Sequence, residues 1–394
     1  MSGPLADPRV CMPTWRAFDR YAYLSCLYES ADVLADSCDL DLLEIQAGRG
    51  FRTRESWQRR LVWHDPSGLT ARLNPGLEPV TVTQDYDLFV IVCQTLKELL
   101  YLNSIKGWKE RCRTSVCIID EIYVAEVKQS KNFLRLLRQF DHVFTELRES
   151  AEPISEIIER PCHYLTAAVD TLRFTPYPNP PARSVDVHSI GRRRPGIHDA
   201  LLALARRDGI FYVYDIFEGG AETRVLNYRE HRDLIAAIAK RSRFFMVAPA
   251  KWDVPQETRG QVAIANRYFE GAAAGAVLLG QSSATDEFRE LFDWDDVVVE
   301  IRADGADVED VLRALAADPE RVMRMSRRNA AQALLRHDWV YRWRDLFEHV
   351  GLTPGPALLA RERRLRELAA LAAESAAEPE PAARRRLESR GRAV

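Results

Sequence analysis

One carboxylate in this chain stands directly before its smallest residues. The stretch NRYFEGAAAGAVLLG, Asn266 to Gly280, places Glu270 before a glycine and three alanines. A helix with so little side-chain bulk lies close to a sheet or a ligand. A carboxylate there accepts two hydrogen bonds at once, which suits the adjacent hydroxyls of a ribose. We therefore predict that Glu270 binds a nucleotide ribose; the alternative is an exposed helix residue beside ordinary packing alanines. Gly275 is predicted to end this helix in a left-handed conformation.

A basic turn offers phosphate chemistry. In VDVHSIGRRRPGIHD an apolar strand is followed by Gly191, by Arg192, Arg193 and Arg194, and then by a proline that opens a helix. Arginine binds phosphate in bidentate fashion, and helix N-termini attract anions. We expect Gly191, Arg192 and Arg193 to contact phosphate; the alternative is a solvated basic turn that caps the helix. A Walker-type glycine-lysine pattern and a G-x-G-x-x-G pattern are both absent from the sequence, which excludes those two phosphate sites.

Two adjacent carboxylates are candidates for acid–base chemistry. Asp120 and Glu121 follow the apolar run SVCII, at the carboxyl end of a predicted strand, where open parallel sheets bind their ligands. A carboxylate so placed can take the proton of an attacking hydroxyl as a general base. The alternative is that one of the two caps the following helix. None of the eight histidines stands in a metal-binding spacing, so no metal site is predicted.

Two series of strands alternating with helices position these residues. Apolar runs at 42–45, 87–93, 115–120 and 142–146 are each followed by an amphipathic stretch, and the alternation resumes from Val185 to Ile301. This pattern is typical of βαβ units around parallel sheets. Between the series lies TLRFTPYPNPPARS, whose prolines predict a stiff linker at 171–184. The fold class is therefore α/β, with two Rossmann-like domains, 1–170 and 185–335, facing across a cleft.

The end of the chain is expected to be less ordered. Trp339 and Trp343 are four residues apart on one predicted helix face, within 336–355, and are expected to pack in a core or between domains. Residues 356–394 are rich in Ala, Arg and Glu. We expect them to bury little apolar surface and to form a frayed helix followed by disorder.

Composition excludes several classes of protein. The chain has 394 residues and a net charge of −3, which gives no electrostatic footprint for nucleic acid. No segment has the roughly 18 uncharged apolar residues of a membrane span, and the start lacks the pattern of a secretory signal. Seven cysteines without a Cys-x-x-Cys pair favour reduced thiols in a cytoplasm. Peripheral membrane contact through the basic tail remains an alternative, although its charges alternate in sign.

Three motifs together carry a family resemblance. RYFEGAAAGAVLLG, with SIGRR upstream and RRNAAQALLRHDWVYRW downstream, resembles the group 1 glycosyltransferases of the GT-B fold. More narrowly, it resembles their spore-maturation (CgeB-like) branch, over Val185 to Leu352. The resemblance implies a transferase that moves a sugar from a nucleotide-sugar donor, held by the C-terminal domain, to an acceptor at the N-terminal domain. No other cofactor is implied, and usually no metal.

The resemblance also implies roles for single residues. Glu270 matches the acidic residue that holds the donor ribose, Arg192 the arginine beside the diphosphate, and Gly275 the glycine that closes the motif helix. It further implies that the helix at 336–355 crosses back to the N-terminal domain.

Two positions depart from the pattern of the wider group. Val262 stands where a second glutamate often contacts the donor sugar, and PGIHD stands where a lysine often follows the Gly-Arg motif. Lys251, Arg259 and Arg267 are candidates to supply the missing positive charge. The alternatives are a solvated loop lysine for Lys251 and pairing with Glu270 for Arg267. Two further functions stay open: a catalytically silent GT-B protein that binds a nucleotide or partner, and a nucleotide-sugar epimerase.

Overall fold

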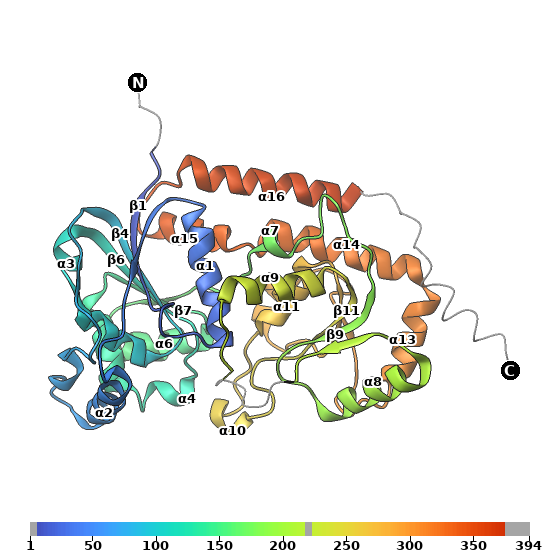
Figure 1. Ribbon diagram of the computed structural model, residues 1–394, viewed down its shortest axis with the longest axis horizontal. Coiled ribbons are helices and arrows are strands. Elements are labelled where there is room, and N and C mark those ends of the chain that lie inside the picture. The colour runs from blue at the N-terminus through green and yellow to red at the C-terminus, as the bar shows by residue number, and fades with distance from the viewer. Residues whose placement is uncertain (1–5, 217–222, 375–394) are drawn as a thin grey trace.

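The computed structural model of the chain describes residues 6–216 and 223–374, and it contains a parallel sheet in each half (Figure 1). The first sheet has six strands in the order β2-β1-β4-β6-β7-β8. Its strands are β1 (Arg9–Thr14), β2 (Asp39–Glu44), β4 (Tyr86–Cys93), β6 (Cys112–Ile119), β7 (His142–Thr145) and β8 (Cys162–Tyr164). A separate two-stranded sheet pairs β3 (Val80–Thr81) with β5 (Ile105–Lys106).

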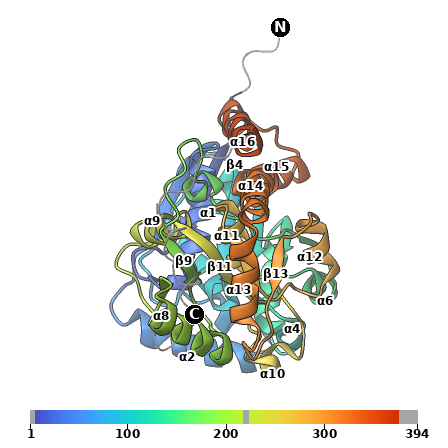
Figure 2. The same cartoon turned by 90° about the vertical axis from the view of Figure 1, so that its right-hand side faces the viewer.

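The second sheet has five parallel strands in the order β10-β9-β11-β12-β13. Its strands are β9 (Val185–Ser189), β10 (Tyr212–Tyr214), β11 (Ser242–Val247), β12 (Val277–Gly280) and β13 (Val298–Glu300). Helices lie on both faces of the sheets (Figures 1 and 2). Strands covered on both faces are apolar throughout, as in β12, where all four residues are buried. The predicted α/β class with two Rossmann-like domains is confirmed.

The longer helices follow the strands in the predicted alternation. In the first half they are α1 (Ser25–Ala35), α2 (Phe51–His64) and α6 (Arg148–Ile158), with short α3 (Trp108–Arg111), α4 (Val124–Val127) and α5 (Lys131–Leu134) between them. Later come α7 (Thr171–Phe174), α8 (Pro195–Asp208), α9 (Tyr228–Ala239), α10 (Pro255–Thr258), α11 (Asn266–Ala273), α12 (Asp286–Leu291), α13 (Val308–Ala317), α14 (Pro319–Arg336), α15 (Trp339–His349) and α16 (Pro356–Glu374). Among the described residues, no helix is both long and apolar enough to cross a membrane.

Strands β1, β3, β5 and β8 and one helix differ from the sequence expectation. The first strand, β1, was not predicted; it contains Pro13, which is atypical of a strand because proline cannot donate to a sheet ladder. The pairing of β1 with β4 involves only Val10 and Cys11, so Pro13 lies past the paired part on that side. The periodic stretch after β4 is a 3-10 helix, Leu96–Ser104, and not an α-helix.

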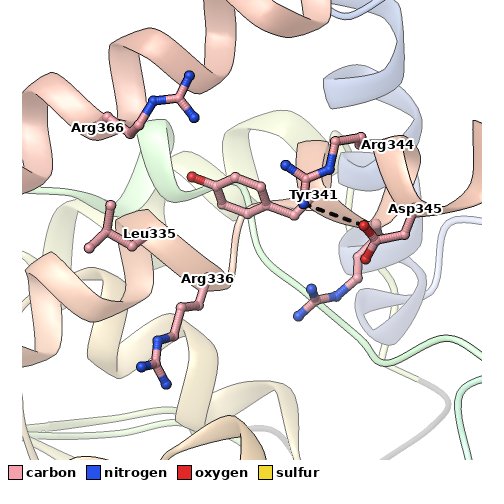
Figure 3. A pocket seen from close by; sticks show the side chains of 7 residues that line it. Leu335, Arg336, Tyr341, Arg344, Asp345 and Arg366 are labelled. Carbon is pink, nitrogen blue, oxygen red and sulfur yellow. Dashed lines mark hydrogen bonds and ion pairs between the residues drawn. The ribbon is translucent and has the colours of Figure 1, made fainter. Parts of the chain in front are cut away.

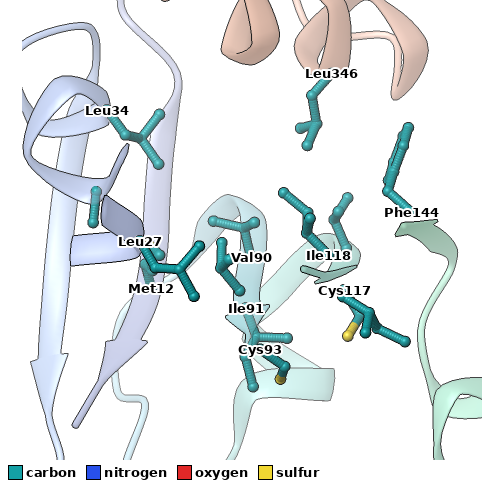
Figure 4. Close-up of a cluster of buried hydrophobic side chains, with 14 of the residues drawn as sticks. Met12, Leu27, Leu34, Val90, Ile91, Cys93, Cys117, Ile118, Phe144 and Leu346 are labelled. Carbon is teal, nitrogen blue, oxygen red and sulfur yellow. The ribbon is translucent and has the colours of Figure 1, made fainter. Parts of the chain in front are cut away.

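The core of the N-terminal domain includes a helix from the far end of the chain. In Figure 4, Leu346 of α15 points toward a group of buried side chains that includes Val90 of β4 and Leu27 of α1. Trp343 is 1% exposed and donates its indole N–H to the carbonyl of Ser30 (3.0 Å). The packing interpretation of Trp343 and its neighbour Trp339 is therefore confirmed.

Helix α16 corrects the expectation for the tail. It runs along the top of Figure 1 and packs on α14 and α15. Its Leu358, Leu365 and Ala372 are fully buried, so the prediction of a frayed helix with little apolar burial is wrong for 356–374. The buried Arg361 donates to Asp338 (2.9 Å) and Asp170 (2.6 Å), which fastens the helix to the segment between the domains. The rest of the predicted tail, 375–394, lies outside the described residues.

Candidate functional site

The basic turn after β9 opens the candidate site. Gly191 has φ of +80°, a left-handed conformation that glycine adopts without strain. Its N–H donates to Asp215 Oδ2 (2.9 Å), and Arg193 donates to the carboxylate and carbonyl of the same residue. Arg192 is exposed, with one ion pair to Asp253 (3.4 Å). The turn is thus held by Asp215, while Arg192 remains accessible to an anionic ligand.

Glu270 lies one turn into α11 and is completely buried. Its exposed fraction is 0%, so the alternative of an exposed helix residue is wrong. Arg267 donates to its Oε2 and also reaches the Ile190 carbonyl with Nε (3.3 Å), directly before Gly191. The alternative that Arg267 pairs with Glu270 is therefore confirmed. Through Arg267, the motif carboxylate fixes the position of the basic turn.

A second arginine and a carboxylate from the other domain complete this buried cluster. Arg232 of α9, 1% exposed, donates to Glu270 Oε1 and, through Nε, to Glu29 Oε2 (2.8 Å). Glu29 belongs to α1 and is 0% exposed. Burial raises the pKa of Glu270, but Arg267 and Arg232 outweigh it and hold the pKa at about 2. Glu270 is therefore ionised, and the cluster ties the N-terminal domain to the predicted donor motif.

The predicted acid–base residues meet the predicted donor lysine across the two domains. Lys251, in the loop after β11, forms an ion pair with Glu121 (3.2 Å), and its ammonium lies 4.6 Å from the centre of the Tyr123 ring. Tyr123 donates its hydroxyl to Glu121 (3.1 Å). The alternative of a solvated loop lysine is wrong, because this side chain is only 17% exposed. Three predicted site residues, Asp120, Glu121 and Lys251, thus lie at one junction.

Asp120 shares its surroundings with a carboxyl group that sequence reasoning missed. Glu146 follows β7 as Asp120 follows the adjacent strand β6, so the two carboxyl groups lie close enough to affect each other's pKa. Burial raises the pKa of Asp120 to about 6 and that of Glu146 well above its ordinary value. A carboxylate with a pKa near neutrality is suited to general base catalysis. Applying the strand-end rule to HVFTE would have identified Glu146.

Gly275 lies apart from this junction, whereas Val262 lies near it. Gly275 ends α11 with φ of +62° and donates its N–H to Ala272 (2.9 Å). Since α11 rises about 1.5 Å per residue, Gly275 is over 10 Å from Arg267, at the end where β12 begins. Its role in the fold is to close the helix, as predicted, and it does not join the site. Val262 is 36% exposed, beside Gln261, which accepts from the Val124 N–H of the other domain (2.9 Å).

A cavity of about 280 Å³ lies between the end of α14, α15 and α16 (Figure 3). The residues that line it include none of the predicted site residues: they are Leu335, Arg336, Tyr341, Arg342, Arg344, Asp345 and Arg366. Arg336 pairs with Asp293, and Arg344 pairs with Glu362 (2.8 Å). No group of three or more potential metal ligands is found in the described ranges.

Comparisons with known proteins agree with this architecture. Residues 199–348 match a family model described as glycosyl transferase-like. No curated protein matches the chain. An alpha-glucosyltransferase solved with UDP and a 13-mer DNA containing a central A:G mismatch has a TM-score of 0.57 at 10% identity. It covers 87% of this chain and 100% of its own.

Two further solved structures give similar alignments. The alpha-glucosyltransferase with UDP and DNA containing an HMU base has a TM-score of 0.56 at 10% identity, covering 88% and 100%. HepE of Anabaena with UDP-glucose has a TM-score of 0.49 at 13% identity, covering 87% and 99%.

The alignments above a TM-score of 0.5 show the GT-B fold, as predicted. The match to the glycosyl transferase-like family model lies within the second half of the chain. These findings support the predicted class, a glycosyltransferase that uses a nucleotide-sugar donor.

Proposed function

We propose that this protein transfers a sugar from a nucleoside diphosphate sugar to an acceptor hydroxyl, as a group 1 enzyme of the spore-maturation branch. The contact between Lys251 and Glu121 carries the proposal. It joins a cation of the glycosyl transferase-like domain to a carboxylate beside Asp120 at the carboxyl edge of the other sheet. The seven cysteines are free thiols, which favours a cytoplasmic location.

The proposed chemistry assigns one step to each side of the junction. Asp120 removes the proton of the acceptor hydroxyl, whose oxygen then forms a bond to the anomeric carbon of the donor sugar. The bond between that carbon and the diphosphate breaks. Arg192, Arg193 and Lys251 stabilise the negative charge on the leaving diphosphate. Burial raises the pKa of Asp120 to about 6, and the interaction with Glu146 acts in the opposite direction and limits this rise.

The role of Glu270 in ribose binding remains part of this proposal. A carboxylate has about four acceptor sites, so two arginine donors leave room for ribose hydroxyls. Because Glu270 is 0% exposed, a ribose reaches it only when Arg267 turns away from it. In this structure, Glu270 instead holds Arg267 in position.

Thermal unfolding with UDP, GDP, dTDP, ADP and CMP in turn tests the donor site. UDP comes first, because it is bound in several solved structures of this fold. At about 100 times its dissociation constant, a nucleotide adds roughly 2.7 kcal/mol, which raises the midpoint by several degrees. We expect Arg192→Ala to reduce this shift, because the exposed Arg192 has little other role.

Arg206→Ala, at the opposite end of α8, is the matched control, because Arg206 is also exposed. It should keep the full shift. No shift with any nucleotide would contradict a donor site. A shift without donor hydrolysis or transfer would favour the catalytically silent alternative, and conversion of the donor sugar without an acceptor would favour an epimerase.

A further inference from the structure

Helix α2 and the segment 65–73 that follows it expose five large apolar side chains. Their exposed fractions are 62% for Trp57, 52% for Leu61, 42% for Trp63, 65% for Leu69 and 58% for Leu73. Trp57 and Leu61 are one turn apart and share a stripe of the helix. The buried face of α2 is complete without them, since Phe51 and Val62 pack into the core. Trp63 also packs edge-on against the ring of the buried Phe133 (5.7 Å between ring centroids), while the other four side chains are not part of the core.

The same surface is strongly basic. We define the α2 surface as these five apolar residues with Arg54, Arg59, Arg60 and Arg72, all of them exposed. On the adjoining α5 and the turn after it, Lys131 and Arg135 are exposed too, and Asn132 bonds the Val62 carbonyl of α2 (2.9 Å).

Of the two acidic groups within α2 and the segment after it, Glu55 is buried and Asp65 is hydrogen-bonded. Glu55 is 6% exposed, and Asp65 accepts hydrogen bonds from Ser67 and Thr70. The whole chain has a net charge of −3, so positive charge is concentrated locally at the α2 surface.

The charge and the side-chain types of the α2 surface favour one kind of binding partner over two others. In a dimer formed through this face, the arginines of the two copies would lie opposite each other and repel, which disfavours self-association. Nucleic acid would use the arginines and tryptophans, but Leu61, Leu69 and Leu73 offer bases no stacking surface. An anionic bilayer provides a favourable environment for each of these side chains. Tryptophan lies at the membrane–water interface, leucine lies among the acyl chains below it, and arginine binds the anionic headgroups.

We propose that the α2 surface binds the surface of an anionic phospholipid membrane. Figure 1 shows α2, α4 and α10 along the same lower side of the molecule. Helix α4 follows Asp120 and Glu121, and α10 follows Lys251. A membrane bound at α2 therefore lies on the side of the molecule that holds the proposed site. This proposal concerns a different segment from the basic tail, which is outside the described residues.

Vesicle flotation of the full chain tests the proposal. Wild-type protein should float with phosphatidylcholine vesicles that contain 30% phosphatidylglycerol, as a chosen composition, and not with phosphatidylcholine alone. High salt should weaken the binding, because exposed charges are screened. The pairs Trp57→Ser with Leu61→Ser and Arg59→Glu with Arg60→Glu should each lower the partition coefficient at least about tenfold.

A matched pair, Leu234→Ser with Arg206→Glu, changes an equally exposed leucine and arginine elsewhere, and it should float as the wild type does. Thermal unfolding should show that all three double variants are folded, because every substituted side chain is exposed. The proposal is overturned if the α2 variants float normally. It is also overturned if the α2 surface binds no vesicle but retains a nucleic acid, or if it forms a dimer that these variants abolish. Nucleotide binding does not enter this assay, so its result is independent of the proposed transferase activity.

Discussion

Asp120→Asn is expected to lower kcat for sugar transfer by about 10²- to 10⁴-fold, the usual contribution of a positioned general base. Asparagine keeps the size of the side chain but cannot accept the proton of the acceptor hydroxyl. In the wild type, burial raises the pKa of Asp120 to about 6. The rate should therefore fall as the pH is lowered through about 6, because the base becomes protonated. Product formation measured from pH 5 to pH 8 checks both expectations.

Stability measurements separate catalysis from helix capping. A carboxyl whose pKa is raised by folding is held in an unfavourable ionised form above its unfolded pKa. Asp120→Asn should therefore unfold at the same temperature as the wild type or at a higher one. If Asp120 instead capped the following helix, the substitution would lower the unfolding temperature. Asp199→Asn, an exposed change on α8, is the control and should alter neither quantity. A full transfer rate in Asp120→Asn would remove Asp120 from the mechanism.

Glu270→Ala is expected to lower the free energy of unfolding by about 3–5 kcal/mol, the usual cost of removing one member of a buried ion pair. The variant leaves Arg232, which is 1% exposed, with Glu29 alone, and leaves Arg267 without its carboxylate. Urea denaturation at pH 7 measures the change. Glu290→Ala is the matched control, because its pair with Arg148 also joins the two domains but is exposed to solvent. Exposed pairs contribute little, so this control should unfold almost as the wild type does.

The pH dependence of stability gives a second check on Glu270. Its folded pKa of about 2 lies below the ordinary 4.5. The stability that it contributes is therefore complete above about pH 4.5 and is lost as the pH falls toward 2. The Ala variant should lack this part of the acid dependence. A small cost at pH 7 with an unchanged acid profile would show that Glu270 is not a structural charge. Its carboxylate would then be free for the ribose.

This structural role also affects how the donor site is tested. A nucleotide shift that disappears in Glu270→Ala would follow equally from lost ribose contact and from a loosened basic turn, since Arg267 links Glu270 to the Ile190 carbonyl. Arg192 does not have this problem, because it is exposed and its one ion pair, to Asp253, is also solvent-accessible. The exposed arginine is therefore the better probe of nucleotide binding.

Local pattern in the sequence determined most of the architecture. Alternating strands and helices predicted both parallel sheets, and the left-handed conformation of Gly275 followed from its place between a helix and a buried strand. The basic turn at Gly191 was visible as arginines directly after a strand. Strand β1, which contains the atypical Pro13, was missed. A helix within 356–374 was predicted but its burial was not, because its Ala and Leu residues do not show that other helices cover them.

Only the tertiary structure decided which charges meet. Glu29, Arg232 and Glu270 are separated by 203 and 38 residues, and each lies on a helix whose pattern would equally suit an exposed position. No periodic pattern or local motif in the sequence indicates that such remote residues pair, because the pairing depends on how the two domains pack. The same reason applies to Lys251 and Glu121. The sequence by itself determined the elements and the candidate residues. Packing between domains decided that Glu270 is buried, and the pairing of β6 with β7 placed Asp120 beside Glu146.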